Sequence, residues 1–159
     1  MGGPRTMETI KLNLGGGLAP IPGYINIDII PEADIRWDLN NGLPQLDKKE
    51  ETLIGVDSIR CHHVLEHLTN IIPLMNDCYE VLIPGAVFEI STPYANTRQS
   101  LQDPTHVRQF VEESYLYFIK DSPFKKEQDE YGITARFIPL EVARGTGTDD
   151  WQLFAKLSK

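Results

Sequence analysis

Short apolar segments alternate with turn residues along the first half of the chain. Four such segments lie at residues 10–14, 24–30, 33–39 and 53–61. Each is bounded by Gly, Pro or Asn turn signals, which is typical of strands. From 71 to 82 the apolar residues recur at helical spacing, 86–92 is again strand-like, and a short helix is expected at 111–119. This alternation of strands and helical segments predicts an α/β sheet of mostly parallel strands.

The last third of the chain has a different pattern. Residues 120–132 are charged and are expected to form an exposed connection. Two extended segments follow at 133–144 and 151–157, and the turn-rich sequence GTGTDD at 145–150 joins them. This arrangement predicts an antiparallel hairpin at the end of the sheet. Because Pro139 lacks a backbone donor, the first hairpin strand is expected to be the outermost strand.

Composition and charge narrow the class of protein. The chain has 159 residues, enough for one core, so we expect a flexible leader at 1–9 and a single domain at 10–159. No apolar stretch approaches the roughly 20 residues that span a bilayer, so no membrane association and a cytoplasmic location are expected. Cys61 and Cys78 lie in apolar surroundings and are expected to be reduced core residues. A net charge of −8 disfavours nucleic acid as a partner.

The strand at 10–14 ends in three glycines, Gly15 to Gly17, and the next apolar segment ends in Asp28. Glycines at the end of a buried strand allow the backbone to approach a ligand, and a single carboxylate can accept hydrogen bonds from two vicinal hydroxyls. A dinucleotide fingerprint needs a third glycine and an acid about 20 residues further on. Here Pro20 follows the glycines, and Asp28 comes eleven residues after Gly17. The sequence therefore favours a nucleoside without phosphates.

Three further segments follow in order: DIRWDL at 34–39, DSIRCHHVLEHL at 57–68 and EVLIPGAVFEI at 80–90. Together with the glycine loop, they resemble the class I S-adenosylmethionine-dependent methyltransferases, and most of all the compact bacterial and phage members. The resemblance covers residues 10–118. It implies a Rossmann-like, mostly parallel sheet with helices on both faces. It also implies S-adenosyl-L-methionine as the cofactor and methyl transfer as the activity.

The resemblance also implies roles for individual residues. The glycine loop would pass under the methionine and ribose parts of the cofactor, Asp28 would bind the ribose hydroxyls, and Asp38 with Leu39 would meet the adenine. The next strand would place His62 and His63 beside the methionine part. The cofactor contacts implied are Leu14, Gly15, Gly16, Gly17, Asp28, Ile29, Asp38, Leu39, His62 and His63. Taken singly, Asp38 could instead cap a turn, and the two histidines could be satisfied by backbone carbonyls.

The acceptor side is expected in two loops after the strand at 86–92, at 92–96 and 103–108. His106 is the expected proton acceptor, with Asp103 orienting its ring, and His63 is a second catalytic candidate. A D-P-x-H stretch of this kind resembles one found in many compact methyltransferases. Asp103 and His106 could instead cap the short helix near 111. We expect a small-molecule or glycan acceptor, while its identity and the formation of a homodimer stay open.

Two other functions are consistent with parts of the sequence. Residues 63–67 read HVLEH, an inverted zinc-protease signature of two histidines and a glutamate. That signature needs a helix and a distant third ligand, so we expect no metal to be bound by His63, Glu66 or His67. The chain could also be a non-catalytic cofactor-fold partner subunit. The intact glycine loop and both aspartates argue against that alternative.

Overall fold

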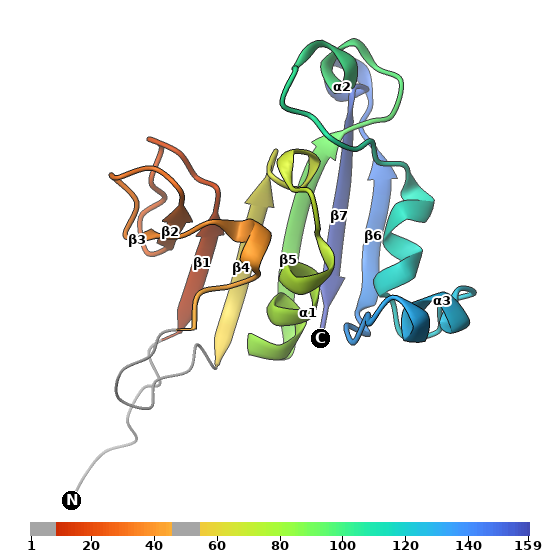
Figure 1. Ribbon diagram of the computed structural model, residues 1–159, viewed down its shortest axis with the longest axis horizontal. Helices are drawn as coiled ribbons and strands as arrows, with labels where there is room; N and C mark the ends of the chain where they lie inside the picture. The colour runs from red at the N-terminus through yellow and green to blue at the C-terminus, as the bar shows by residue number, and fades with distance from the viewer. Residues whose placement is uncertain (1–8, 46–54) are drawn as a thin grey trace, which may run out of the picture.

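The computed structural model describes residues 9–45 and 55–159, so most of the expected leader and the start of the segment at 53–61 lie outside the described residues. Within the described residues, seven strands form one sheet in the order β3-β2-β1-β4-β5-β7-β6 (Figure 1). The strands are β1 (Ile10–Leu14), β2 (Ile25–Asp28), β3 (Ile35–Arg36), β4 (Val56–His62), β5 (Leu82–Pro93), β6 (Ile138–Arg144) and β7 (Gln152–Ser158). Strands β1 to β5 pair in parallel, and β7 is antiparallel to both β5 and β6.

This topology confirms the predicted Rossmann-like, mostly parallel sheet with a C-terminal antiparallel hairpin. Strand β6 is the outermost strand, as the proline within it predicted. The segments predicted at 24–30, 33–39 and 133–144 are each longer than the strands observed. Strand β3 has only two residues because Asp38 caps a helical turn directly after it.

The helical elements are α1 (Ile72–Val81), α2 (Arg98–Gln102), α3 (Lys125–Glu130) and the 3₁₀ helices η1 (Leu39–Asn41), η2 (Leu65–His67), η3 (Glu112–Phe118) and η4 (Gly147–Asp149). The helix predicted at 71–82 is confirmed as α1, whereas the one predicted at 111–119 is the 3₁₀ helix η3. Within the described residues, no helix has both the length and the apolar character needed to cross a membrane.

The two faces of the sheet differ in their side chains. Leu12, Ile59 and Phe88 point to one face and are fully buried, together with Met75 of α1. Arg60 points to the other face and is only half-buried. We expected helices on both faces. In the described residues the connection from β1 to β2 holds no helix, and α1 lies in front of the sheet in Figure 1.

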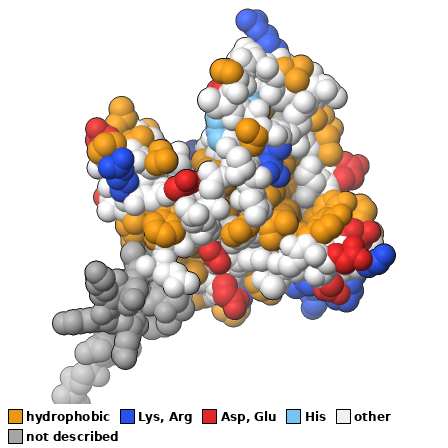
Figure 2. Space-filling model, in the orientation of Figure 1, with side chains coloured by type: hydrophobic (Ala, Val, Ile, Leu, Met, Phe, Trp, Pro, Cys, Tyr) orange, Lys and Arg blue, Asp and Glu red, His pale blue; other side chains and the backbone are white. Residues whose placement is uncertain are grey.

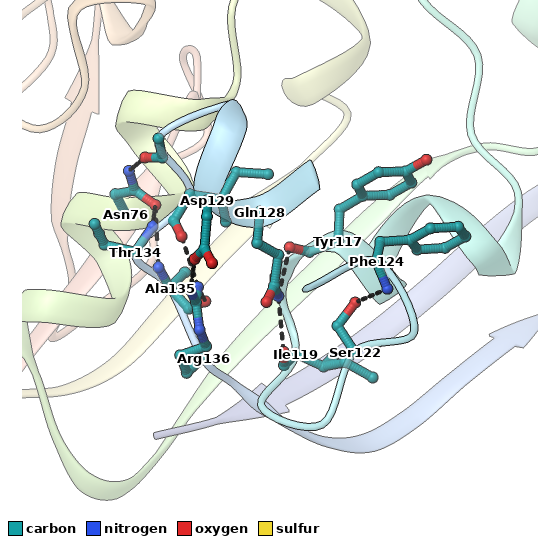
Figure 3. A network of polar contacts seen from close by, with 12 residues as sticks. Asn76, Tyr117, Ile119, Ser122, Phe124, Gln128, Asp129, Thr134, Ala135 and Arg136 are labelled. Atoms are coloured by element: carbon teal, nitrogen blue, oxygen red, sulfur yellow. Dashed lines mark hydrogen bonds and ion pairs between the residues drawn. The ribbon is translucent and has the colours of Figure 1, made fainter. Parts of the chain in front are cut away.

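A network of polar contacts fixes the chain between η3 and β6 (Figure 3). Gln128 of α3 is buried, and its amide nitrogen donates to the carbonyl oxygens of Tyr117 and Ile119 at 3.0 and 2.9 Å. From α1, the side-chain Oδ1 of Asn76 accepts the Thr134 N–H at 2.9 Å. The segment at 120–132 therefore contains the helix α3, held against the body of the protein, and is not simply the exposed connection that we predicted.

Candidate functional site

The glycine loop leaves the carboxyl end of β1 in a conformation that suits glycine. Gly15 and Gly17 have φ angles of 64° and 55°, in the left-handed region that side chains disfavour. The Gly16 N–H donates to Asn26 Oδ1 at 3.1 Å. A Cβ at Gly16 would overlap the side-chain amides of Asn13 and Asn26. The backbone of this loop is therefore held close to β2, which ends in Asp28.

Asp28 is bonded to the glycine loop through its carboxylate. Its Oδ2 accepts the Gly17 N–H at 2.8 Å, and its Oδ1 accepts the Ile30 N–H at 3.3 Å. A carboxylate has about four lone-pair positions, so each oxygen of Asp28 keeps one that could accept a hydrogen bond from a hydroxyl. The loop and the acid thus form one preorganised unit.

A cavity of about 310 Å³ opens between this unit and the carboxyl ends of β3 and β4. Such a volume is at the lower end of the range for small-molecule sites. The residues that line it are Gly15, Asp28, Ile29, Trp37, Asp38, Leu39, Asn40, His63, Val64, His67 and Leu68. Six of them belong to the ten cofactor contacts predicted from the sequence. Figure 2 shows histidine side chains at the surface beside the notch that separates the β2–β3 end of the sheet from the rest of the molecule.

Asp38 occupies the far wall of the cavity and also caps a turn. Its Oδ1 accepts the Asn40 N–H at 2.9 Å and the Asn40 side-chain amide at 3.0 Å. Both bonds use Oδ1, so Oδ2 can still accept from a ligand. Leu39 is buried beneath it, whereas Ile29 is 60% exposed at the mouth. The two interpretations of Asp38, as a cap and as a ligand contact, are therefore compatible.

Sequence reasoning missed Trp37 as a wall of the cavity. Its indole N–H donates to the Gly42 carbonyl oxygen at 3.0 Å, which fixes the ring beside η1. Its position could have indicated this role, because Trp37 directly follows the strand β3 and precedes Asp38. Val64, His67 and Leu68, in and beside the turn η2, were also missed as cavity residues.

His63 reaches the cavity as predicted, in a strained conformation with φ of 56°. Its Nδ1 lies 3.4 Å from Glu66 Oε1, its Nε2 lies 3.1 Å from Gln152 Oε1, and its ring stacks on Trp151. The Glu66 carboxylate beside the ring raises the pKa of His63. The contact therefore stabilises the protonated form of the ring.

Four of the ten predicted contacts do not line this cavity: Leu14, Gly16, Gly17 and His62. Successive residues of a strand point to opposite faces, so His62 shares the face of Arg60. It lines a second cavity of about 450 Å³ together with Leu14 and Gly16. Burial first, and then Arg60, lower the pKa of His62 to about 4. The two cavities meet at Gly15, which lines both.

The D-P-T-H loop comes to the edge of the first cavity. The His106 ring lies edge-on to His67, with ring centroids 4.7 Å apart, and its Nε2 is 3.8 Å from Asp103 Oδ2. Hydrogen bonds from the side chain and backbone of Thr105 lower the pKa of Asp103. Neither Asp103 nor His106 caps η3, which begins at Glu112.

The other predicted acceptor loop, at 92–96, continues β5 and contacts η3. Its first two residues belong to β5, and the Tyr94 hydroxyl donates to Glu112 Oε2 at 2.9 Å. No residue of either predicted loop lines the first cavity. The loop at 103–108 lies beside it, because Thr105 and His106 contact His67, which does line it.

The protease signature at 63–67 lacks the helix that its chemistry requires. His63 ends the strand region with a left-handed backbone, and Glu66 and His67 lie in the three-residue turn η2. The two histidines therefore do not face one another along a helix.

Comparisons with known proteins bear on the fold and on the activity of relatives. No family model matches the chain. A curated relative from Mycolicibacterium smegmatis, named "Probable S-adenosylmethionine-dependent methyltransferase", is 29% identical over 107 residues, which cover 65% of this chain. The match spans only 39% of that relative's length.

Solved structures share the fold over nearly the whole chain. An S-adenosylmethionine-dependent methyltransferase from Mesorhizobium loti matches with a TM-score of 0.57 at 16% identity, covering 96% of this chain and 91% of that one. The N-methyltransferase NodS from Bradyrhizobium japonicum, in complex with S-adenosyl-L-homocysteine, matches with a TM-score of 0.53 at 17% identity, covering 95% and 78%. The chain thus has the fold of the class I S-adenosylmethionine-dependent methyltransferases, as its sequence predicted.

Proposed function

We propose that this chain binds S-adenosyl-L-methionine in the cavity beside the glycine loop and transfers the methyl group to a small-molecule or glycan acceptor. The observation that carries this proposal is the bond between Asp28 and Gly17, at the mouth of a cavity formed by the carboxyl ends of β1 to β4. Open α/β sheets bind their ligands at this edge. The relative named as a methyltransferase supports the same activity.

The residues around the cavity fit such a cofactor. Asp28 offers two acceptor positions for vicinal ribose hydroxyls, and a charge-assisted pair of this kind is among the stronger hydrogen bonds. Asp38 offers an acceptor for an adenine amino group, and the apolar side chains of Leu39 and Ile29 line the same cavity. The turns at Gly15 and Gly17 leave the loop without side chains where the cofactor would lie closest.

A diphosphate cofactor fits less well. A dinucleotide site places its phosphates at the N-terminus of a helix that directly follows the glycine loop. In this chain the residues between Gly17 and Tyr24 form turns and no helix. The site therefore favours a nucleoside that lacks phosphates.

The chain's part in the reaction is mainly one of positioning. When bound, S-adenosylmethionine supplies a methyl group on a positively charged sulfur, which an acceptor atom displaces in line. Holding two reactants in line can contribute roughly 7–11 kcal/mol of the barrier, so no catalytic triad is needed. On this proposal, His67 and His106 face the acceptor, and His63 lies on the wall toward β5 and β7.

Formation of S-adenosyl-L-homocysteine tests the proposal. The chain is incubated with S-adenosylmethionine and a panel of alcohols, amines, thiols and sugars, and the product is measured by mass spectrometry. We expect product formation that depends on at least one acceptor class. Cofactor binding without product from any class would favour the non-catalytic partner subunit, and failure to bind the cofactor would refute the proposal.

A further inference from the structure

Glu66, His67 and His106 form a compact group beside the first cavity. Each offers one ligand atom, and the three atoms lie within 4.8 Å of one another. Glu66 and His67 come from the turn η2, and His106 comes from the loop after α2, so the group joins segments that are far apart in the sequence. His67 also lines the cavity, which places the group at its edge.

Glu66 is the part of this group that most requires a partner. The residue is only 1% exposed, and neither carboxylate oxygen has a hydrogen-bond donor in the described part of the chain. His63 lies 3.4 Å from Oε1, close enough for an ion pair but outside hydrogen-bond geometry. An ionised carboxylate is costly to bury unless it is paired or coordinates a cation. The second oxygen, Oε2, is therefore suited to a metal ion.

The hydrogen bonds of the two rings leave the same ring nitrogen, Nε2, available to a metal ion. His106 Nδ1 lies 3.2 Å from the Ser100 carbonyl oxygen, which can only accept, so Nδ1 carries the proton. The Thr105 hydroxyl donates to Asp103, so its oxygen accepts from His67 Nδ1 at 2.9 Å. In each ring Nε2 keeps its lone pair. Metal-binding histidines almost always donate their other N–H to an oxygen in this way.

Further hydrogen bonds hold the two segments together without using the group itself. The Val107 N–H donates to the backbone oxygen of Glu66 at 2.8 Å. The Arg108 side chain donates to the backbone oxygens of Leu68 and Thr69 at 3.0 and 2.7 Å. The group is therefore set by the fold and not by the chance orientation of surface side chains.

We propose that Glu66, His67 and His106 bind a divalent first-row transition-metal ion such as Zn²⁺. Two imidazoles and one carboxylate are a donor set that such ions accept, and three protein ligands leave coordination positions for another molecule. His67 lines the first cavity, so those positions are reached from the cavity. From the sequence we expected no metal at His63, Glu66 or His67, because the signature needs a distant third ligand. The fold instead brings His106 beside Glu66 and His67.

The site also indicates the chemistry of the acceptor, an inference that rests on the proposed function. A bound divalent ion lowers the pKa of an oxygen that coordinates it. An acceptor hydroxyl bound there would lose its proton to solvent, and the electron pair of the O–H bond would stay on the oxygen. The acceptor class is therefore an alcohol or a sugar hydroxyl. His106 then acts through its lone pair on the metal and not as the direct proton acceptor.

Metal titration tests the site independently of the cofactor. The chain is prepared without a histidine tag, treated with a chelator, and titrated with Zn²⁺ by calorimetry and with Co²⁺ by visible absorption. We expect one ion per chain. Because the loss of an outer-shell contact weakens metal binding roughly 10–100-fold, His67→Ala and His106→Ala should weaken it by more than about 100-fold.

Matched variants separate coordination from folding. Thr105→Val removes no ligand but leaves His67 Nδ1 without its acceptor, so affinity should fall roughly 10–100-fold. His62→Ala removes a histidine of the second cavity and should leave metal affinity unchanged. Absence of binding by the unmodified chain, or full binding by both His67→Ala and His106→Ala, would overturn the site.

The proposed function is tested separately, by titration with S-adenosyl-L-homocysteine in the presence of chelator. Metal binding without S-adenosyl-L-homocysteine binding would refute the proposed function but not the metal site. S-adenosyl-L-homocysteine binding without metal binding would refute the metal site. If the acceptor inference holds, chelator abolishes the methylation of hydroxyls and added metal restores it. Undiminished methylation in chelator would overturn the role of the metal.

Discussion

Replacing Asp28 with alanine removes a contact that serves both the fold and the proposed cofactor. The carboxylate accepts two backbone N–H groups, from Gly17 at 2.8 Å and from Ile30 at 3.3 Å. Hydrogen bonds to a charged group contribute about 1.5–3 kcal/mol. The longer bond is weak, so we expect the free energy of unfolding to fall by about one such bond. In a domain of this size that corresponds to a decrease in Tm of roughly 3–12 °C.

The loss of cofactor affinity has a similar magnitude for the same reason. If ribose hydroxyls donate to the remaining lone pairs of Asp28, losing these hydrogen bonds should weaken cofactor binding by about 1.5–3 kcal/mol. This raises the Kd roughly 10- to 150-fold. Calorimetry with S-adenosyl-L-homocysteine measures the change, at a temperature well below the Tm of the variant.

A neighbouring carboxylate provides the matched control. Asp34 Oδ2 accepts the Asn26 N–H at 2.8 Å, yet Asp34 does not line the cavity. Asp34→Ala should therefore lower stability to a similar extent and leave the Kd within a few-fold. Unchanged affinity in Asp28→Ala would show that Asp28 makes no cofactor contact. An equal loss in both variants would show that the affinity depends on loop order alone.

Three other variants test separate parts of the account. The pKa of His62 is lowered from 6.5 to about 4, so the unfolded chain binds more protons than the folded one between these pH values. Stability that is present above pH 6.5 is therefore lost as the pH falls toward 4. Chemical denaturation of His62→Gln should show a smaller loss over this range, and the same pH dependence in both proteins would contradict this. Gly16→Ala places a methyl group against Asn13 and Asn26, which should lower the free energy of unfolding by about 1–3 kcal/mol, and unchanged stability would show that the loop can yield. Arg108→Ala should weaken Zn²⁺ binding roughly 10-fold without removing a ligand, and unchanged affinity would show that the two segments hold their places without it.

The sequence predicted best the features that depend on neighbouring residues. The end of β1, the glycine turns and Asp28 lie within a few residues of one another, so spacing alone indicated their geometry. Pro139 predicted the edge strand because a missing donor has only one tolerated position in a sheet. The strand at 33–39 was overestimated because the Asp38 cap ends the extended conformation early.

Contacts between distant segments could not be read from the sequence. The meeting of His106 with Glu66 and His67 depends on the path of the loop after β5, and no local pattern specifies that path. His62 is different, because the strand period already places it on the face of Arg60, opposite to Cys61.

Calorimetric titration of the unmodified chain with S-adenosyl-L-methionine, and separately with NAD, tests the central claim most directly. Asp28 is bonded to a glycine loop that no helix follows, so a nucleoside should bind here, whereas the diphosphate of NAD would find no helix N-terminus to bind it. We predict one S-adenosylmethionine site per chain and no measurable binding of NAD. NAD binding more tightly than S-adenosylmethionine, or no binding of S-adenosylmethionine at millimolar concentration, would contradict the account.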